Sequence, residues 1–226
     1  MLLRIPHLLT PDEIAECRRA LGEADWIDGR DTAGYLSAGV KRNAQLAAQD
    51  PVALRIGALI TARLSENPLF LSAALPQAIM PPLFNLYAGG GHYGSHIDGA
   101  IRSIDGGHRR IRTDLSMTVM LSDPADYEGG ELVIEDHYGD RPVKLPAGDA
   151  ILYPSTSIHH VTPVTRGGRL AAFTWIQSMV RDGGVRAQLF ELDGAIQQLP
   201  EDEAGQASRL RLSNVYHNLL RHFAEL

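Results

Sequence analysis

The sequence predicts an α+β protein with a mainly β core and packing helices at its N-terminal and C-terminal ends. Three observations indicate this class. Helix-capping signals stand near the N-terminus, short apolar segments separated by glycine, proline and aspartate fill the middle, and a helical apolar period returns after Asp182. Many short strands without helices between them are typical of an antiparallel sandwich or barrel. We expect three regions: 1–77, which packs on the core; 78–180, the core itself; and 181–226, a helical extension.

Two helices are predicted before the core. Thr10-Pro11-Asp12-Glu13 supplies a capping hydroxyl, a proline at the first helical position and a glutamate three residues after the cap, and Gly22 is a plausible end. A second helix should start at Asp50-Pro51. Apolar residues then recur at helical spacing in both: Ile14, Cys17 and Leu21 in the first, and Val52, Ile56, Leu59 and Ile60 in the second.

Five apolar segments of the middle region are predicted to be strands. They are residues 84–87, 115–121, 131–134, 150–153 and 170–177. Turn sequences such as Asp123-Pro124 and Gly167-Gly168 separate them. Beyond the core, an amphipathic stripe predicts a C-terminal helix with Val215, Leu219, Leu220 and Phe223 on one face.

Composition and charge exclude several classes of protein. The 226 residues are 44% hydrophobic and 21% charged, which suits one principal domain with added elements. A net charge of -6 gives no footprint for nucleic acid or an anionic membrane. Cys17 is the single cysteine, so neither an intramolecular disulfide nor a cysteine-built metal site can form. Neither a signal-peptide core nor an apolar run of the ~20 residues that span a bilayer is present, and we expect a cytoplasmic protein.

His96-Ile97-Asp98 is the first candidate for chemistry. Alternate residues of a strand project from one face, so His96 and Asp98 would present an imidazole and a carboxylate together. A divalent ion needs a third ligand, and the best candidate is His159, with His160 beside it as the alternative. Two histidines and one carboxylate on one face of iron leave three positions open, as a chelating cosubstrate and dioxygen require.

Arg169 is the second candidate, ten residues after His159 and at the start of a strand-like segment. An arginine inside a sheet-lined cavity is costly unless it meets an anion, and its planar fork suits a carboxylate. The alternative is a surface arginine after the Gly167-Gly168 turn.

The motifs His96-x-Asp98, His159-x-Val161-x-Pro163 and Arg169-Leu-Ala-Ala-Phe-Thr-Trp175 resemble those of the iron- and 2-oxoglutarate-dependent dioxygenases of the prolyl 4-hydroxylase group. The closer resemblance is to the bacterial PKHD-type hydroxylases, over the whole length of the chain. Its most specific parts are residues 87–98, 128–132 and 153–175.

This resemblance implies a role for each matching residue. His96, Asp98 and His159 match the iron ligands, which selects His159 over His160, and Arg169 matches the residue that pairs with the distal carboxylate of 2-oxoglutarate. Tyr87 resembles a tyrosine that hydrogen-bonds the same cosubstrate. The implied fold of region 78–180 is a double-stranded β-helix, or jelly roll, in agreement with the strand pattern.

The implied function is hydroxylation of an unactivated carbon with release of succinate and CO2. It uses Fe(2+), 2-oxoglutarate and O2, with L-ascorbate as an accessory reductant. The implied substrates are a prolyl-type protein residue or a siderophore-related small molecule. The end helices offer surfaces for a homodimer. The alternatives are a cupin-like metal-dependent enzyme, which would not require Arg169 or Tyr87, and a non-catalytic metal-binding jelly roll, which would not need all three ligands.

Four other features have weaker functional interpretations. His92 is a minor candidate for a place beside the metal, and Gly89 to Gly94 fit a dinucleotide-binding pattern that a following strand would make accidental. The basic segment from Arg102 to Arg112 is interpreted as a solvated loop, with a mobile lid over an acidic or oxygen-rich substrate as the alternative. Lys41-Arg42-Asn43 would lie at the edge of the substrate cleft.

Overall fold

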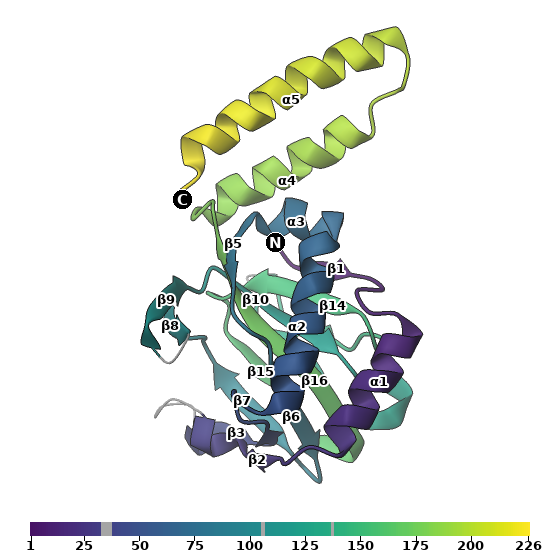
Figure 1. The fold of residues 1–226 in the computed structure, drawn as a ribbon, viewed down its shortest axis with the longest axis vertical. Helices are drawn as coiled ribbons and strands as arrows, with labels where there is room; N and C mark the ends of the chain where they lie inside the picture. Colours follow the sequence, from purple (N-terminus) through teal and green to yellow (C-terminus); the bar gives the residue numbers. More distant parts are fainter. Residues whose placement is uncertain (33–37, 105–106, 137) are drawn as a thin grey trace.

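Two antiparallel sheets and a small hairpin form the core of the computed structural model, which describes residues 1–32, 38–104, 107–136 and 138–226. The larger sheet has the strand order β1-β14-β10-β16-β6-β4-β2, with β5 and β11 also pairing with β16, and the smaller has the order β13-β12-β15-β7-β3. This is the mainly β, jelly-roll type of architecture that the sequence predicts, with both sheets open. Helices lie outside the β core at both ends of the chain (Figure 1).

The strands of the larger sheet are short except for β16. They are β1 (Leu3–Ile5), β2 (Ile27–Asp28), β4 (Ala44–Gln45), β5 (Pro76–Ile79), β6 (Leu83–Ala88), β10 (Leu115–Met120), β11 (Tyr127–Gly129), β14 (Ala150–Pro154) and β16 (Val164–Ser178). The smaller sheet contains β3 (Lys41–Arg42), β7 (His92–His96), β12 (Leu132–Ile134), β13 (Arg141–Val143) and β15 (His159–Val161). The separate hairpin pairs β8 (Ile101–Ile104) with β9 (Arg109–Arg112).

The helices are α1 (Pro11–Gly22), α2 (Pro51–Glu66), α3 (Pro68–Ala74), α4 (Gly183–Gln197) and α5 (Glu203–Phe223). The predicted capping box of α1 is present, since Glu13 N–H donates to Thr10 Oγ1 and Thr10 N–H donates to Glu13 Oε2. Asp50 caps α2 through the amides of Val52 and Ala53. Both predicted starts are therefore confirmed.

The first three helices cover the outer face of the larger sheet. Ile56 and Ile60 of α2 and Cys17 and Leu21 of α1 join the main apolar core, to which β10, β14 and β16 contribute alternate residues (Figure 1). The other residues of those strands face the smaller sheet, because successive side chains of a strand point to opposite faces. On β16 this alternation places Arg169, Phe173 and Trp175 on the inner side. The space between the two sheets is where the polar candidates meet.

Helices α4 and α5 form an antiparallel pair that extends away from the β core (Figure 1). Tyr216 and Leu220 of α5 pack in a small apolar cluster with Leu189 of α4. Of the predicted stripe, Leu220 is the member that packs there, whereas Val215, Leu219 and Phe223 are exposed. The predicted helix is present, but much of its apolar face lies uncovered by this chain.

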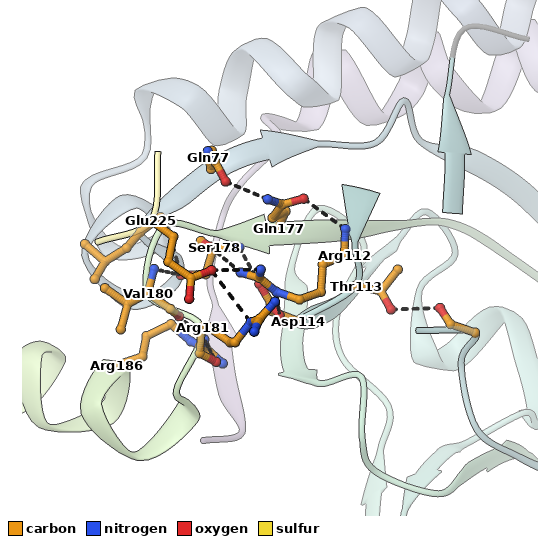
Figure 2. Close-up of polar contacts among 12 residues, drawn as sticks. Gln77, Arg112, Thr113, Asp114, Gln177, Ser178, Val180, Arg181, Arg186 and Glu225 are labelled. Atoms are coloured by element: carbon orange, nitrogen blue, oxygen red, sulfur yellow. Dashed lines mark hydrogen bonds and ion pairs between the residues drawn. The ribbon is translucent and has the colours of Figure 1, made fainter. Parts of the chain in front are cut away.

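A polar cluster attaches this helical pair to the core (Figure 2). Arg112, the last residue of β9, donates to Asp114 Oδ1 at 2.7 Å, to Glu225 Oε2 at 3.1 Å and to the Ser178 carbonyl at 3.2 Å. Arg186 of α4 donates to the Val180 carbonyl at 2.7 Å. Glu225, near the end of the chain, is therefore bound to β9 of the hairpin.

Candidate metal and cosubstrate site

A cavity of about 450 Å³ lies between the two sheets. Its lining includes every residue that the sequence selects for metal or cosubstrate binding: His96, Asp98, His159, Arg169 and Tyr87. Its volume falls within the range of small-molecule sites. The predicted metal centre and the predicted carboxylate anchor therefore share one cavity.

His96, Asp98 and His159 converge on one point. Each offers one ligand atom, and the three atoms all lie within 4.8 Å of one another. The pairing of β7 with β15 places His96 opposite His159, and Asp98 follows directly after β7. The ring centroids of the two histidines are 4.2 Å apart, and His159 Nε2 lies 3.8 Å from Asp98 Oδ2. These residues could hold one divalent ion with a face left open.

The backbone orients both imidazoles for metal binding. His96 Nδ1 lies 2.8 Å from the Gly94 carbonyl, and His159 Nδ1 lies 3.0 Å from the Ser157 carbonyl. Donation from Nδ1 leaves Nε2 with its lone pair for a metal. Burial, followed by the nearby His159, lowers the pKa of His96 to about 4, so this imidazole is neutral at neutral pH.

A serine pair supports the carboxylate. Ser116 Oγ donates to Asp98 Oδ2 at 2.6 Å and lies 2.7 Å from Ser155 Oγ. Tyr153 packs its ring edge-on against His159 at 5.2 Å between centroids. Sequence reasoning missed the role of these three residues, because serine and tyrosine in a strand carry no signal of what they touch.

Arg169 is buried at the opposite side of the cavity, with 2% of its surface exposed. Its Nε has no hydrogen-bond partner, and within the described ranges no carboxylate forms an ion pair with it. Tyr87, opposite Arg169 in the pairing of β6 with β16, has its ring centroid 5.4 Å from the guanidinium carbon. Burial raises the pKa of Tyr87 to about 12, which keeps its phenol protonated as a donor. A buried cation with an unpartnered donor fits an anionic cosubstrate such as a dicarboxylate.

The weaker candidates lie elsewhere or have other surroundings. His160 lies 3.9 Å from Glu135 and outside the cavity lining, and His92 lies near the Gly90 carbonyl, outside the three-residue cluster. A strand, β7, follows the glycine-rich segment, so no helix N-terminus is available there for a pyrophosphate.

The basic segment is a β hairpin over its described residues, and 105–106 lie outside them. Its structure corrects the interpretation as a solvated loop. Arg109 and Arg110 are exposed, but Arg102 turns into the cavity, where Lys41 also lies. Arg102 lies on β8, whereas Arg109 and Arg110 lie on the paired strand β9. Because alternate residues of a strand face opposite sides, one basic segment can present some side chains to the cavity and others to solvent.

Comparison with known proteins identifies two matching segments. The model of the 2OG-Fe(II) oxygenase superfamily matches residues 82–177, and that of the PKHD-type hydroxylase C-terminal domain matches residues 183–225. A PKHD-type hydroxylase of Pseudomonas paraeruginosa is 56% identical over 226 residues, which is 100% of both chains.

Solved structures share the fold at low identity. A Pseudomonas putida prolyl-4-hydroxylase is 22% identical, covers 78% of this chain and 92% of its own, and gives a TM-score of 0.51. HygX from Streptomyces hygroscopicus, solved with nickel, 2-oxoglutarate and hygromycin B bound, is 16% identical, covers 79% of this chain and 84% of its own, and gives 0.54.

Fold, cavity and comparisons together define an iron(II)- and 2-oxoglutarate-dependent dioxygenase. The chain belongs to the PKHD-type hydroxylase family.

Proposed function

We propose that His96, Asp98 and His159 hold the iron and that Arg169 and Tyr87 hold 2-oxoglutarate, in an enzyme that hydroxylates an unactivated carbon of its substrate. The observation that carries this proposal is the three-residue cluster, whose ligand atoms lie within 4.8 Å of one another, in the same cavity as a buried arginine with an unpartnered donor. A cupin-like metal enzyme would have no use for that arginine.

The residues of this chain position the reactants. The three ligands would hold the metal, and Ser116 orients Asp98 through its hydrogen bond. The guanidinium of Arg169 would pair with the distal carboxylate of the cosubstrate, and protonated Tyr87 would donate a hydrogen bond to it. When bound, the iron and 2-oxoglutarate supply the oxidation, in which decarboxylation to succinate accompanies insertion of one oxygen atom of O2 into a C–H bond.

The primary substrate is proposed to be a prolyl-type residue or a small molecule of the siderophore-related kind. The cavity volume of about 450 Å³ supports either a single residue of a peptide or a small molecule beside the cosubstrate. The net charge of -6 supports the expectation that nucleic acid is not among the partners of this protein. Among the described residues, none of the helices combines the length and apolar character that a membrane crossing needs.

The iron assignment is tested by loading the protein with Fe(II) without oxygen, measuring bound iron, and then following succinate formation from 2-oxoglutarate in air. His159→Ala should lose stoichiometric iron and succinate formation, and His160→Ala should retain both. Turnover that survives in His159→Ala but is lost in His160→Ala would overturn the choice of ligand.

The cosubstrate assignment is tested by Arg169→Ala. Removing one partner of a buried charge pair costs about 2–5 kcal/mol, so the affinity for 2-oxoglutarate should fall by at least about 30-fold while iron content stays unchanged. An unchanged affinity would show that Arg169 does not anchor the cosubstrate.

A further inference from the structure

Arg102 is a second cation in the cavity whose role the iron and 2-oxoglutarate do not explain. Its guanidinium carbon lies 3.5 Å from the ring centroid of Trp175, so the planar group stacks on the indole face. Its Nε is buried without a hydrogen-bond partner. In the part of the chain that the structure describes, no carboxylate lies within ion-pair distance of Arg102. A guanidinium whose buried Nε has no hydrogen-bond partner is costly unless it meets an anion.

Lys41 adds positive charge to the same cavity. Only 8% of its surface is exposed, and its Nζ donates to the neutral Gln45 Oε1 at 2.6 Å. Burial and then the charge of Arg102 lower the pKa of Lys41 to about 8, and both side chains line the same cavity. An anion in this cavity would be attracted by both positive charges.

The described lining of the cavity contains more positive than negative side chains. It has three Lys and Arg side chains, Lys41, Arg102 and Arg169, and one carboxylate, Asp98. Iron(II) and the 2-oxoglutarate dianion cancel each other, and Asp98 offsets one cation. The described lining keeps a net positive charge after Arg169 has paired with the cosubstrate, and Arg102 is the cation there whose buried Nε has no hydrogen-bond partner.

The remaining wall near Arg102 is apolar. Phe173, Trp175 and Leu83 line the cavity there, and Ile97, which is 58% exposed, reaches its rim beside the proposed iron ligands. An anionic group at Arg102 would therefore belong to a molecule whose body is apolar. Such a body would lie between the anion subsite and the metal.

We propose that the primary substrate carries a carboxylate that binds Arg102, in the cavity that Lys41 also lines, with an apolar body that lies along Trp175 and Phe173. This inference rests on the proposed function, because it assumes that Arg169 is occupied by 2-oxoglutarate. Arg102 and Lys41 then determine which molecules enter, and position the bond to be oxidised at the iron. The planar, stacked guanidinium is suited to bidentate pairing with a carboxylate.

The test uses 3-phenylpropanoate and its neutral isostere 3-phenylpropanamide as probes. Each is titrated without oxygen into full-length protein saturated with Fe(II) and 2-oxoglutarate, and binding is followed by calorimetry. The acid should bind about tenfold more tightly than the amide, and Arg102→Gln should abolish this preference. Arg110→Gln, a change to an exposed arginine of the same hairpin, should leave it intact.

Equal affinity for acid and amide in the unaltered protein would overturn the inference, as would an acid preference that survives in Arg102→Gln. The unaltered protein alone decides the first point, so the test holds even if the variant fails to fold. The affinity for 2-oxoglutarate is measured on the same samples. Loss of cosubstrate binding would contradict the proposed function itself, whereas normal cosubstrate binding without an acid preference would contradict only the anion subsite.

Discussion

At the scale of single residues, the cavity is built from side chains that are expensive to bury. Two imidazoles, one carboxylate, two arginines and one lysine line a space between two sheets, and the other face of the larger sheet is apolar. Each needs a partner to offset its desolvation. The hydrogen bonds to His96, His159 and Asp98 supply part of this compensation from the chain itself. The rest is expected from bound ligands.

Ser116→Ala tests the support of the carboxylate. Losing the 2.6 Å hydrogen bond frees the rotamer of Asp98, so the affinity for Fe(II) or Mn(II) should fall about 10- to 100-fold without a change of fold. Metal titration with circular dichroism of each variant is the measurement. Ser95→Ala is the matched control, because Ser95 lies exposed on the same strand as His96. Equal losses in both variants would contradict a specific role for Ser116.

Lys41→Met tests the cost of the buried ammonium. A pKa lowered from 10.5 to about 8 corresponds to at most about 3 kcal/mol of destabilisation while Lys41 is charged, and the lost hydrogen bond to Gln45 reduces the net gain of the variant to about 1 kcal/mol. The unfolded chain binds more protons than the folded one between pH 8 and 10.5, so the stability contributed by this site rises with pH across that window.

The metal-free variant should therefore be more stable than the unaltered protein at pH 7, and this advantage should shrink as the pH rises from 8 to 10.5. Urea unfolding at pH 7 and at about pH 10 measures the difference. An advantage that grows with pH would show that burial does not lower the pKa of Lys41.

At the scale of elements, Gly130, in the turn before β12, limits the position of the Arg169 side chain. Gly130 has φ +68°, and a Cβ there would lie 3.1 Å from Arg169 Cδ and 2.9 Å from Tyr127 Cε2. The turn before β12 is thus shaped around the arginine of another strand. The segment Glu128 to Leu132 connects β11 to β12 and also limits the position of the candidate cosubstrate anchor.

Gly130→Ala should weaken 2-oxoglutarate binding about 10- to 100-fold, because the added methyl displaces Arg169 from its place in the cavity. Gly139→Ala is the control. It has φ +105° with nothing within 4 Å of the added Cβ, so it takes up the same kind of backbone strain without touching the site. Calorimetric titration of both metal-loaded variants distinguishes them. Equal affinities would contradict a steric link between this turn and Arg169.

Local sequence signals predicted the elements that depend on local chemistry. The capping box of α1, the Asp50 cap of α2 and the strands with clear alternation are all present. The β8–β9 hairpin was not predicted as strands, because half of its strand residues are arginines and its stability comes from pairing and from Arg102 on Trp175. The contacts of Ser116, Tyr153 and Gly130 depend on register between distant strands, which no local pattern encodes.

At the scale of the whole molecule, the α4–α5 pair differs from the β core in how it is stabilised. Gly205 is the buried residue of α5, and contacts with α4 and the polar cluster around Arg112 provide its attachment (Figure 2). Glu225, which follows α5, forms ion pairs with Arg112 and Arg181. Its side chain is 51% exposed, so these ion pairs contribute little to stability. The helical pair should open more readily than the sheets.

Hydrogen exchange followed by mass spectrometry tests this difference. In dilute protein, peptides of α5 should open at roughly 2 kcal/mol below the global free energy of unfolding and exchange about 30-fold faster than those of β10 and β16. Protection of α5 equal to that of β16 would contradict a weakly held helix. Protection that increases with protein concentration would instead show that a second copy covers Val215, Leu219 and Phe223.

The division of the cavity between two sheets has a mechanical consequence. His96 and His159 belong to the smaller sheet, whereas Tyr87 and Arg169 belong to the larger one. A metal chelated by 2-oxoglutarate, with its far end at Arg169, would connect them as a removable crosslink. A ligand at a concentration of 100 times its Kd adds about 2.7 kcal/mol to stability. The melting temperature of the loaded protein is therefore a label-free gauge of occupancy, and libraries of acids can be screened with it before any product is identified.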